Sequence, residues 1–252
     1  MRITGNTILI TGGTSGIGLA LAEAFHAIGN EVIITGRRHE HLREITAGRP
    51  GFTGIHLDVN DPGSHATLAI RIREKFPHLN VLIANAGISR AEDMTSGEWN
   101  TSDAEEIIQT NILGVLRVTA ALLPILKQQP AATIMATSSA LAFIPRADFP
   151  TYCASKAFLH SWLQSLRHQL CSTSVEVLEL SPPYVRTGLT GIHQITDPRA
   201  VPLDEYVATV MDLLVKNEHP RGEILLERDL ARRWAERDGT YDALFAAMNP
   251  SA

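Results

Sequence analysis

The chain has very little cysteine: only Cys153 and Cys171 occur in 252 residues. Two thiols are too few for the disulfide framework of a small secreted domain, so we expect a reducing, cytoplasmic location. The opening MRITGNTILITGG lacks the charged and then apolar pattern of a signal peptide. No uninterrupted apolar run approaches the roughly 20 residues that cross a bilayer, so we expect no membrane partner.

Positive charge is also scarce. The formal net charge is -5, and no basic stripe is present, which argues against a nucleic-acid partner. The histidines do not form a ligand set: His65, His78, His160 and His168 are scattered on predicted helix faces, where packing or surface roles are usual. We therefore expect no metal. The remaining composition, 44% hydrophobic and 19% charged, is ordinary for a globular protein.

Short β-branched runs alternate with amphipathic stretches along the whole chain, a pattern typical of a parallel sheet covered by helices. The predicted strands are 7–11, 31–35, 53–57, 81–84, 132–137, 175–180 and 223–226. The predicted helices begin near Ile17, His39, Pro62, Ser102, Thr151 and Leu203. We predict an α/β fold, a Rossmann-type doubly wound parallel sheet of about seven strands with helices on both faces, as a single domain over residues 1–252. The aperiodic, proline-rich segment at about 183–202 is predicted to be a substrate loop or lid.

A glycine-rich turn joins the first predicted strand to the first predicted helix. Glycines at such a turn let the backbone approach a diphosphate, and the helix N-terminus favours its negative charge. A tight connector is the alternative, but the position between a strand and a helix favours a nucleotide. The turn lacks a P-loop lysine and the second glycine of a nucleophile elbow. The predicted cofactor-binding residues here are Gly12, Thr14, Ser15, Gly16, Ile17 and Gly18.

Two arginines, Arg37 and Arg38, follow the second predicted strand. An acidic residue near this position typically binds the ribose 2′-hydroxyl of NAD, whereas a basic residue suits the 2′-phosphate of NADP. No acid occurs before Glu40, so we predict that NADP(H) is preferred over NAD(H), with Arg37 as the main phosphate contact. A solvated helix start is the alternative interpretation.

Further polar and small residues follow the third and fourth predicted strands. Asp58, with Val59 beside it, is placed to bind the adenine, and Asn85-Ala86-Gly87 is placed against the cofactor. The tripeptide is equally compatible with a plain turn.

The spacing Tyr152-x-x-x-Lys156 puts a phenol and an ammonium on one helix face. We expect the ammonium to lower the pKa of the phenol toward working pH. Ser139, thirteen positions before the tyrosine, would hold a carbonyl oxygen while Tyr152 gives or takes its proton. Such a set interconverts an alcohol and a ketone.

Together these residues resemble the short-chain dehydrogenase/reductase family over nearly the whole chain, and within it the DltE-like oxidoreductases. The motifs that carry the resemblance are Thr11 to Gly18, Asn85-Ala86-Gly87, Asn111, Ser138-Ser139 and Tyr152-Cys153-Ala154-Ser155-Lys156. The resemblance implies an NADP(H)-dependent oxidoreductase acting on a small carbonyl or alcohol substrate. It also implies that the helices at about 102–127 and 151–171 pair subunits into a homodimer or homotetramer, unless their apolar faces are buried within one subunit.

The resemblance also implies residue roles. Tyr152 is the proton donor or acceptor, Lys156 lowers its pKa and binds the nicotinamide ribose, Ser139 holds the substrate oxygen, and Asn111 orders a water relay to Lys156. After the sixth strand the family's glycine is replaced by Pro183, which removes a backbone donor. The cofactor contacts of Pro182, Val185 and Thr187 are expected to remain.

The substrate is less visible in the sequence. An apolar pocket is expected from Leu141, Phe143, Ile144, Phe149, Tyr184 and the segment 189–195, although Phe143 and Ile144 equally suit packing against the next helix. Arg146 and Arg186 either meet an anionic substrate or face solvent. A non-catalytic NADP(H)-binding redox sensor is the alternative function, and the intact catalytic set argues against it. An epimerase or dehydratase would need a larger C-terminal region.

Overall fold

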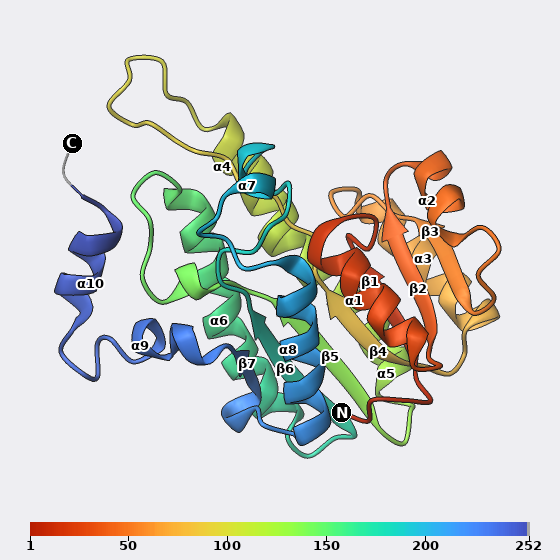
Figure 1. Cartoon of the computed structure of the whole chain (residues 1–252). Helices are drawn as coiled ribbons and strands as arrows, with labels where there is room; N and C mark the ends of the chain where they lie inside the picture. Colours follow the sequence, from red (N-terminus) through yellow and green to blue (C-terminus); the bar gives the residue numbers. More distant parts are fainter. Residues whose placement is uncertain (251–252) are drawn as a thin grey trace.

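The computed structural model describes residues 1–250 and contains one sheet of seven parallel strands in the order β3-β2-β1-β4-β5-β6-β7. The strands are β1 Thr7–Thr11, β2 Glu31–Gly36, β3 Phe52–His56, β4 Leu79–Ala84, β5 Ala132–Thr137, β6 Val175–Ser181 and β7 Glu223–Leu225. The order reverses direction at β1, so the chain fills one half of the sheet and then the other (Figure 1). The predicted fold class is confirmed.

Helices flank both faces of this sheet (Figure 1). They are α1 Gly16–Ala27, α2 His39–Thr46, α3 Pro62–Lys75, α4 Ser102–Ile107, α5 Gly114–Leu126, α6 Pro150–Leu170, α7 His193–Thr196, α8 Leu203–Lys216, α9 Leu230–Arg233 and α10 Tyr241–Met248. Short helical turns complete the set: η1 Ile108–Leu113, η2 Ala140–Ala142, η3 Pro220–Gly222 and η4 Glu227–Asp229. The six predicted helix starts agree within one residue.

Alternation along the strands divides the core into two layers. Leu9, Leu82 and Ile134 point toward α3, α5 and α6, whereas Ile8 and Ile83 point toward α1 and α8. Every residue of β1, β4 and β5 is buried, as central parallel strands require because helices cover both faces.

The structure describes most of the C-terminal stretch whose docking or fraying the sequence does not decide. The stretch ALFAAMNPSA is compatible with docking or with fraying. Its residues 243–248 form the end of α10, and its last two residues lie outside the described part. Asn249 then docks on the segment before α6: its side chain accepts from Ala147 N (2.7 Å) and donates to Pro145 O (3.1 Å). That one domain takes in all of residues 1–252 stays a prediction.

The run Ser102–Leu126 is, within residues 1–250, the one helix that is long and apolar enough to cross a membrane by length and composition. Polar and charged residues interrupt its apolar stretches, so it contains no long uninterrupted apolar run. Val115, Val118 and Leu122 are buried against the sheet. Core helices of soluble proteins have the same length and apolar composition, and the absence of a membrane partner stays a prediction.

Candidate active site

A cavity of about 600 Å³ lies at the carboxyl ends of the central strands, a usual size for a small-molecule site. Its wall contains most of the predicted site residues: Gly12, Thr14, Ser15, Gly16, Ile17, Arg37, Arg38, Asp58, Val59, Asn85, Ala86, Gly87, Ser139, Tyr152, Lys156, Pro182, Val185 and Thr187. Gly18 and Asn111 lie behind this wall. Parallel strands bring residues from six separate loops to one edge of the sheet, so the predicted residues are close in space.

The glycine-rich turn packs so closely against neighbouring backbone that side chains would not fit at two of its positions. Gly12 has φ +65°, and a Cβ there would lie 2.9 Å from Ala86 Cα. A Cβ on Gly18 would lie 2.4 Å from Gly12 O, so the missing side chain lets α1 approach the turn. Ser15 is the N-cap of α1, and across residues 1–250 no side chain caps this helix end. Its first N–H groups therefore suit an anion, and the turn fits a diphosphate.

Asn85 joins the ends of three strands behind the cavity. Its backbone N–H donates to Thr11 Oγ1 (3.0 Å), and its side-chain amide donates to Thr11 O (3.3 Å). Thr137 Oγ1 donates to the Asn85 side-chain oxygen (3.2 Å). Thr11 belongs to β1, Asn85 follows β4 and Thr137 ends β5. The tripeptide Asn85-Ala86-Gly87 is thus held by hydrogen bonds to both neighbouring strands.

The next part of the wall carries the two arginines. Arg37 and Arg38 follow β2, are exposed and line the cavity. Asp58, after β3, lines it too, and one of its carboxylate oxygens accepts from Asn60 N (2.9 Å). A guanidinium pair beside a site for a diphosphate suits an additional phosphate.

Tyr152 and Lys156 come from the first two turns of α6 and are both buried. Lys156 Nζ lies 5.6 Å from the centre of the Tyr152 ring and donates to Thr137 O (2.8 Å). Ser139 caps η2, and its hydroxyl accepts from Leu141 N (3.1 Å). The Ser139 hydroxyl also interacts with Tyr152 and slightly favours the phenolate. Phenol, ammonium and hydroxyl therefore meet at one end of the cavity.

The pKa values differ from the sequence expectation. Burial raises the pKa of Tyr152 to about 12, and the interaction with Ser139 offsets only part of this rise. Burial also lowers the pKa of Lys156 to about 8. The expected lowering of the tyrosine pKa by the ammonium is not seen, because desolvation of the buried phenolate is the larger effect on the Tyr152 pKa.

Asn111 lies inside a π-helical turn, η1, which interrupts the long helix predicted at 102–127. Its side chain is fully buried, accepts from Ile88 N (2.9 Å), and donates to Ile88 O (2.9 Å) and Ser155 Oγ (3.0 Å). Asn111 thus fixes the chain after Gly87 to α6. Single π turns are frequent at functional sites, and this one aims Asn111 into the space between these elements. The water relay to Lys156 stays a prediction.

The predicted lid at 183–202 is more ordered than its sequence suggested. Arg186 N donates to Val201 O (2.9 Å) and Val201 N donates to Tyr184 O (2.8 Å), so the two ends of the segment are joined despite Pro183. The buried Gln194 donates to Val185 O (2.7 Å) and accepts from Thr190 N (2.8 Å). This glutamine, in α7, lines the cavity and ties the segment to the backbone at Val185. That the segment acts as a lid stays a prediction.

We expect Gln194→Ala to raise the KM for the predicted carbonyl substrate about tenfold, because a buried hydrogen-bonded amide contributes about 1–2 kcal/mol to holding the loop. Steady-state kinetics with the predicted cofactor, NADPH, at saturation would measure this. His193→Ala, in the same turn, is the control and should leave KM within about twofold. Equal KM values for Gln194→Ala and the parent protein would contradict a closing role for this loop.

Pro183, Gly188, Leu189 and Gln194 line the cavity from the predicted loop at 183–202. The lining residues that were not anticipated are Thr35, Gly36, Leu57, Asn60, Ile88, Arg90, Glu106, Thr110, Thr137 and Ser138. Most of these residues flank the predicted motifs, and their positions at the ends of predicted strands would have been sufficient to predict them. Arg90 and Glu106 form an ion pair (3.4 Å) across the aperiodic segment before α4, which no sequence pattern indicates.

The residues expected to make an apolar pocket lie mostly elsewhere. Ile144 is fully buried, and the Phe143 ring packs edge-on against His160 (5.1 Å between centroids), which supports the alternative of packing. Leu189 does line the cavity, whereas Tyr184 donates to Asp197 (3.3 Å). Arg146 and Arg186 are exposed, and Arg146 pairs with Asp148.

Comparison with known proteins agrees with this geometry. The family described as short chain dehydrogenase matches residues 6–196. An uncharacterized oxidoreductase, DltE, from Bacillus subtilis is 40% identical over 252 residues, covering 99% of this chain and 98% of that protein. A Burkholderia cenocepacia short chain dehydrogenase in complex with NADP has a TM-score of 0.83 at 23% identity, with 100% of both chains covered. A Burkholderia phymatum short chain dehydrogenase/reductase in complex with NAD has a TM-score of 0.80 at 20% identity, covering 100% of this chain and 98% of that one. The chain therefore belongs to the short-chain dehydrogenase/reductase family of oxidoreductases.

Proposed function

We propose that this protein transfers a hydride between NADP(H) and a carbonyl or alcohol substrate, with Tyr152 as general acid and base. The observation that carries the proposal is the meeting of Tyr152, Lys156 and Ser139 in the cavity that also contains the α1 turn and Arg37. One end of the cavity offers proton transfer and the other offers anion binding. A single elongated ligand with phosphates would reach both.

The cofactor would be held by the turn before α1, by Arg37 and Arg38, and by the residues after β4. When bound, its reduced nicotinamide supplies the hydride. The arginines support NADP(H) over NAD(H), because a guanidinium can donate hydrogen bonds to the oxygens of a 2′-phosphate. A free 2′-hydroxyl is instead usually bound by an acidic residue.

The protein's own groups act on the substrate oxygen. A phenol with a pKa of about 12 stays protonated at neutral pH, which suits Tyr152 as the acid in reduction. The Ser139 hydroxyl and the Lys156 ammonium stabilise negative charge as it develops on that oxygen. In oxidation the same tyrosine accepts the proton, and it must first be deprotonated to the phenolate.

A panel of ketones and aldehydes, assayed by loss of NADPH absorbance, tests the proposal. Turnover of any member that depends on Tyr152 supports it. Tight NADPH binding without turnover of a broad panel would favour the non-catalytic sensor instead.

Lys156 gives the reduction a predicted pH dependence. Because burial lowers the pKa of Lys156 to about 8, its ammonium is charged below that pH and neutral above it. We expect kcat for reduction to be highest below pH 8 and to fall as the pH rises through that value. A pH–rate profile at saturating NADPH would measure the fall. Lys156→Arg keeps the charge at every pH, so its residual activity should lack this decline. A decline unchanged in Lys156→Arg would assign it to another group.

We also propose that the helices α4, α5 and α6 pair subunits into a homodimer or homotetramer. Ile108 in η1 and Phe158 in α6 are apolar and 41% and 39% exposed, although η1 and α6 are neighbours. Exposed apolar side chains on two elements in contact favour burial against a second copy. Light scattering of the parent protein and of Phe158→Glu would test this.

A further inference from the structure

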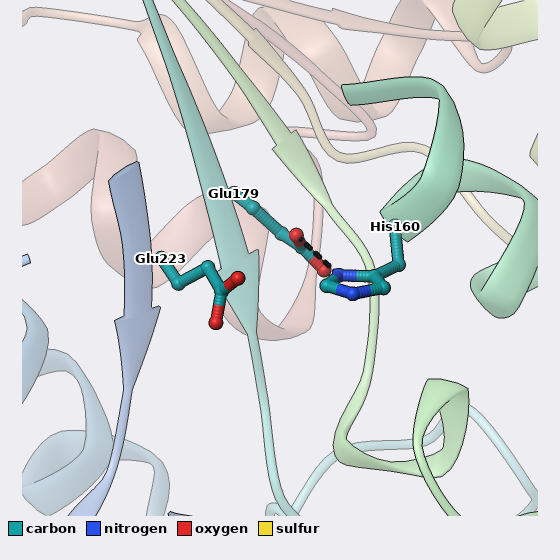
Figure 2. A group of neighbouring side chains, drawn as sticks. All are labelled: His160, Glu179 and Glu223. Atoms are coloured by element: carbon teal, nitrogen blue, oxygen red, sulfur yellow. Dashed lines mark hydrogen bonds and ion pairs between the residues drawn. The ribbon is translucent and has the colours of Figure 1, made fainter. Parts of the chain in front are cut away.

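Beneath the cavity, on the α6 side of the sheet, lies a buried cluster that the proposed chemistry does not use. It contains His160, Glu179 and Glu223 (Figure 2), with one side-chain atom of each within 4.8 Å of the others. Glu179 is fully buried in β6 and pairs in register with Glu223 of β7. From the sequence, a packing or surface role was predicted for His160 and no histidine ligand set was expected. Nothing in the order of residues along the chain indicates that His160 lies beside β6 and β7.

The cluster has the composition of a metal site but is already satisfied by hydrogen bonds. Both Glu223 oxygens accept from Arg233 (2.8 and 2.9 Å). His160 Nδ1 lies 2.8 Å from Glu179 Oε2, and Gln164 Nε2 lies 3.0 Å from His160 Nε2. A ring with its hydrogen on Nδ1 donates to Glu179 and accepts from Gln164. A guanidinium beside the carboxylates would repel a cation, so we interpret the cluster as a hydrogen-bond network.

The two oxygens of Glu179 contact two different catalytic elements. Oε1 accepts from Ser138 Oγ (2.5 Å), and Ser138 directly precedes Ser139. Oε2 accepts from His160, which lies one helical turn after Lys156 on α6. One buried carboxylate therefore spans the strand end that carries the serine and the helix that carries the tyrosine and lysine.

The backbone transmits this contact to Ser139. Ser138 N donates to Leu180 O (2.8 Å), and Ala140 N donates to Pro182 O (2.9 Å), so the chain on both sides of Ser139 is fixed to the end of β6. Ser139 is extended (φ -169°, ψ 155°), and successive side chains of an extended chain point to opposite sides. Holding the Ser138 hydroxyl at Glu179 therefore turns Ser139 away from it, toward Tyr152.

We propose that Glu179 is a positioning residue: through Ser138 and His160 it sets the distance between the Ser139 hydroxyl and the Tyr152 phenol. This inference rests on the proposed function, because it assigns a role within that reaction. The physical reason for a kinetic effect is that reacting groups displaced by about 1 Å lose on the order of 10²-fold in rate. A buried carboxylate holds such a distance well, since each hydrogen bond to it is charge-assisted.

Two buried serines that share the Glu179 carboxylate provide a matched test. Ser138→Ala removes the link between Glu179 and the residue before Ser139. Ser181→Ala removes a hydroxyl that bonds both Glu179 Oε1 (3.2 Å) and Ser138 Oγ (2.6 Å), but it leaves the hydrogen bond from Ser138 to Glu179 in place. We expect Ser138→Ala to lower kcat about tenfold and Ser181→Ala to lower it less than about twofold, with the Kd for NADPH unchanged in both. Equal loss in the two variants, or no loss in Ser138→Ala, would overturn the proposal.

A double-mutant cycle separates positioning from general stability. If the network acts through Ser139, then Ser139→Ala should cost about 10²-fold in the parent protein but less than about tenfold in Ser138→Ala. Full additivity of the two losses would overturn the proposal.

On the helix side, His160→Leu should lower kcat, and His160→Asn, whose amide replaces the Nδ1 donor, should restore most of it. A His160→Asn variant as slow as His160→Leu would also count against it.

Tyr152→Phe, assayed in parallel, distinguishes the two levels of inference. Turnover that survives in Tyr152→Phe contradicts the proposed function itself. Turnover that is lost there, combined with equal effects of the two serine variants, overturns only the role of Glu179.

Discussion

Replacing Tyr152 by phenylalanine is expected to lower carbonyl reduction by about 10²–10⁴-fold, the usual contribution of a positioned general acid. Phenylalanine keeps the buried ring in place and removes only the hydroxyl that gives the proton. The Kd for NADPH should change little, because Lys156 and the α1 turn are untouched. Steady-state turnover and NADPH titration by fluorescence would measure the two quantities.

A matched control is available elsewhere in the core. Tyr206 in α8 is fully buried, and within residues 1–250 its hydroxyl has no hydrogen-bond partner. Tyr206→Phe therefore removes the same atom from another buried tyrosine and should leave turnover within about twofold. If both tyrosine variants were equally active, the acid–base role of Tyr152 would be wrong.

Replacing Arg37 by aspartate is expected to reverse the cofactor preference. A charged hydrogen bond to phosphate contributes about 1.5–3 kcal/mol, so kcat/KM for NADPH should fall by at least about 10²-fold once repulsion is added. The new carboxylate accepts from a ribose 2′-hydroxyl, so kcat/KM for NADH should rise. The ratio of the two values, measured with one carbonyl substrate, is the readout.

Arg43→Asp provides the control for charge alone. Arg43 is exposed on α2, a few residues further along the chain. Its replacement by aspartate changes the net charge by the same amount as Arg37→Asp. It should leave the NADPH to NADH ratio within about threefold, since screening weakens exposed charges beyond about 10 Å. An unchanged ratio in Arg37→Asp would show that Arg37 does not bind the 2′-phosphate.

The strands were predictable because their signal is local. Buried parallel strands such as β1 and β5 must be apolar on both faces, and both were predicted with the bounds that the structure gives. Errors occur at the ends: β3 begins and ends one residue earlier than predicted, and β4 begins two residues earlier, at Leu79. Strand ends depend on hydrogen bonds to neighbouring strands, which the chain order does not show.

The π-helical turn at Asn111 was not predictable for a related reason. The segment 102–127 has an ordinary helical pattern, and one extra residue per turn at η1 leaves hardly any trace in it. The irregularity is stabilised by the contacts of Asn111 with Ile88 and Ser155, residues that lie 23 and 44 positions away.

The fold class, the family and the residue types that gather at the strand ends could be read from local patterns, because periodicity, glycine turns and the Tyr152–Lys156 spacing are local properties of the chain. The pKa values and the contacts of these groups depend on tertiary packing. Burial raised the pKa of Tyr152 where the sequence predicted that a neighbouring charge would lower it. Three separate segments placed Glu179 between Ser138 and His160. Desolvation and long-range hydrogen bonds depend on what surrounds an atom in space, and that environment exists only once the chain has folded.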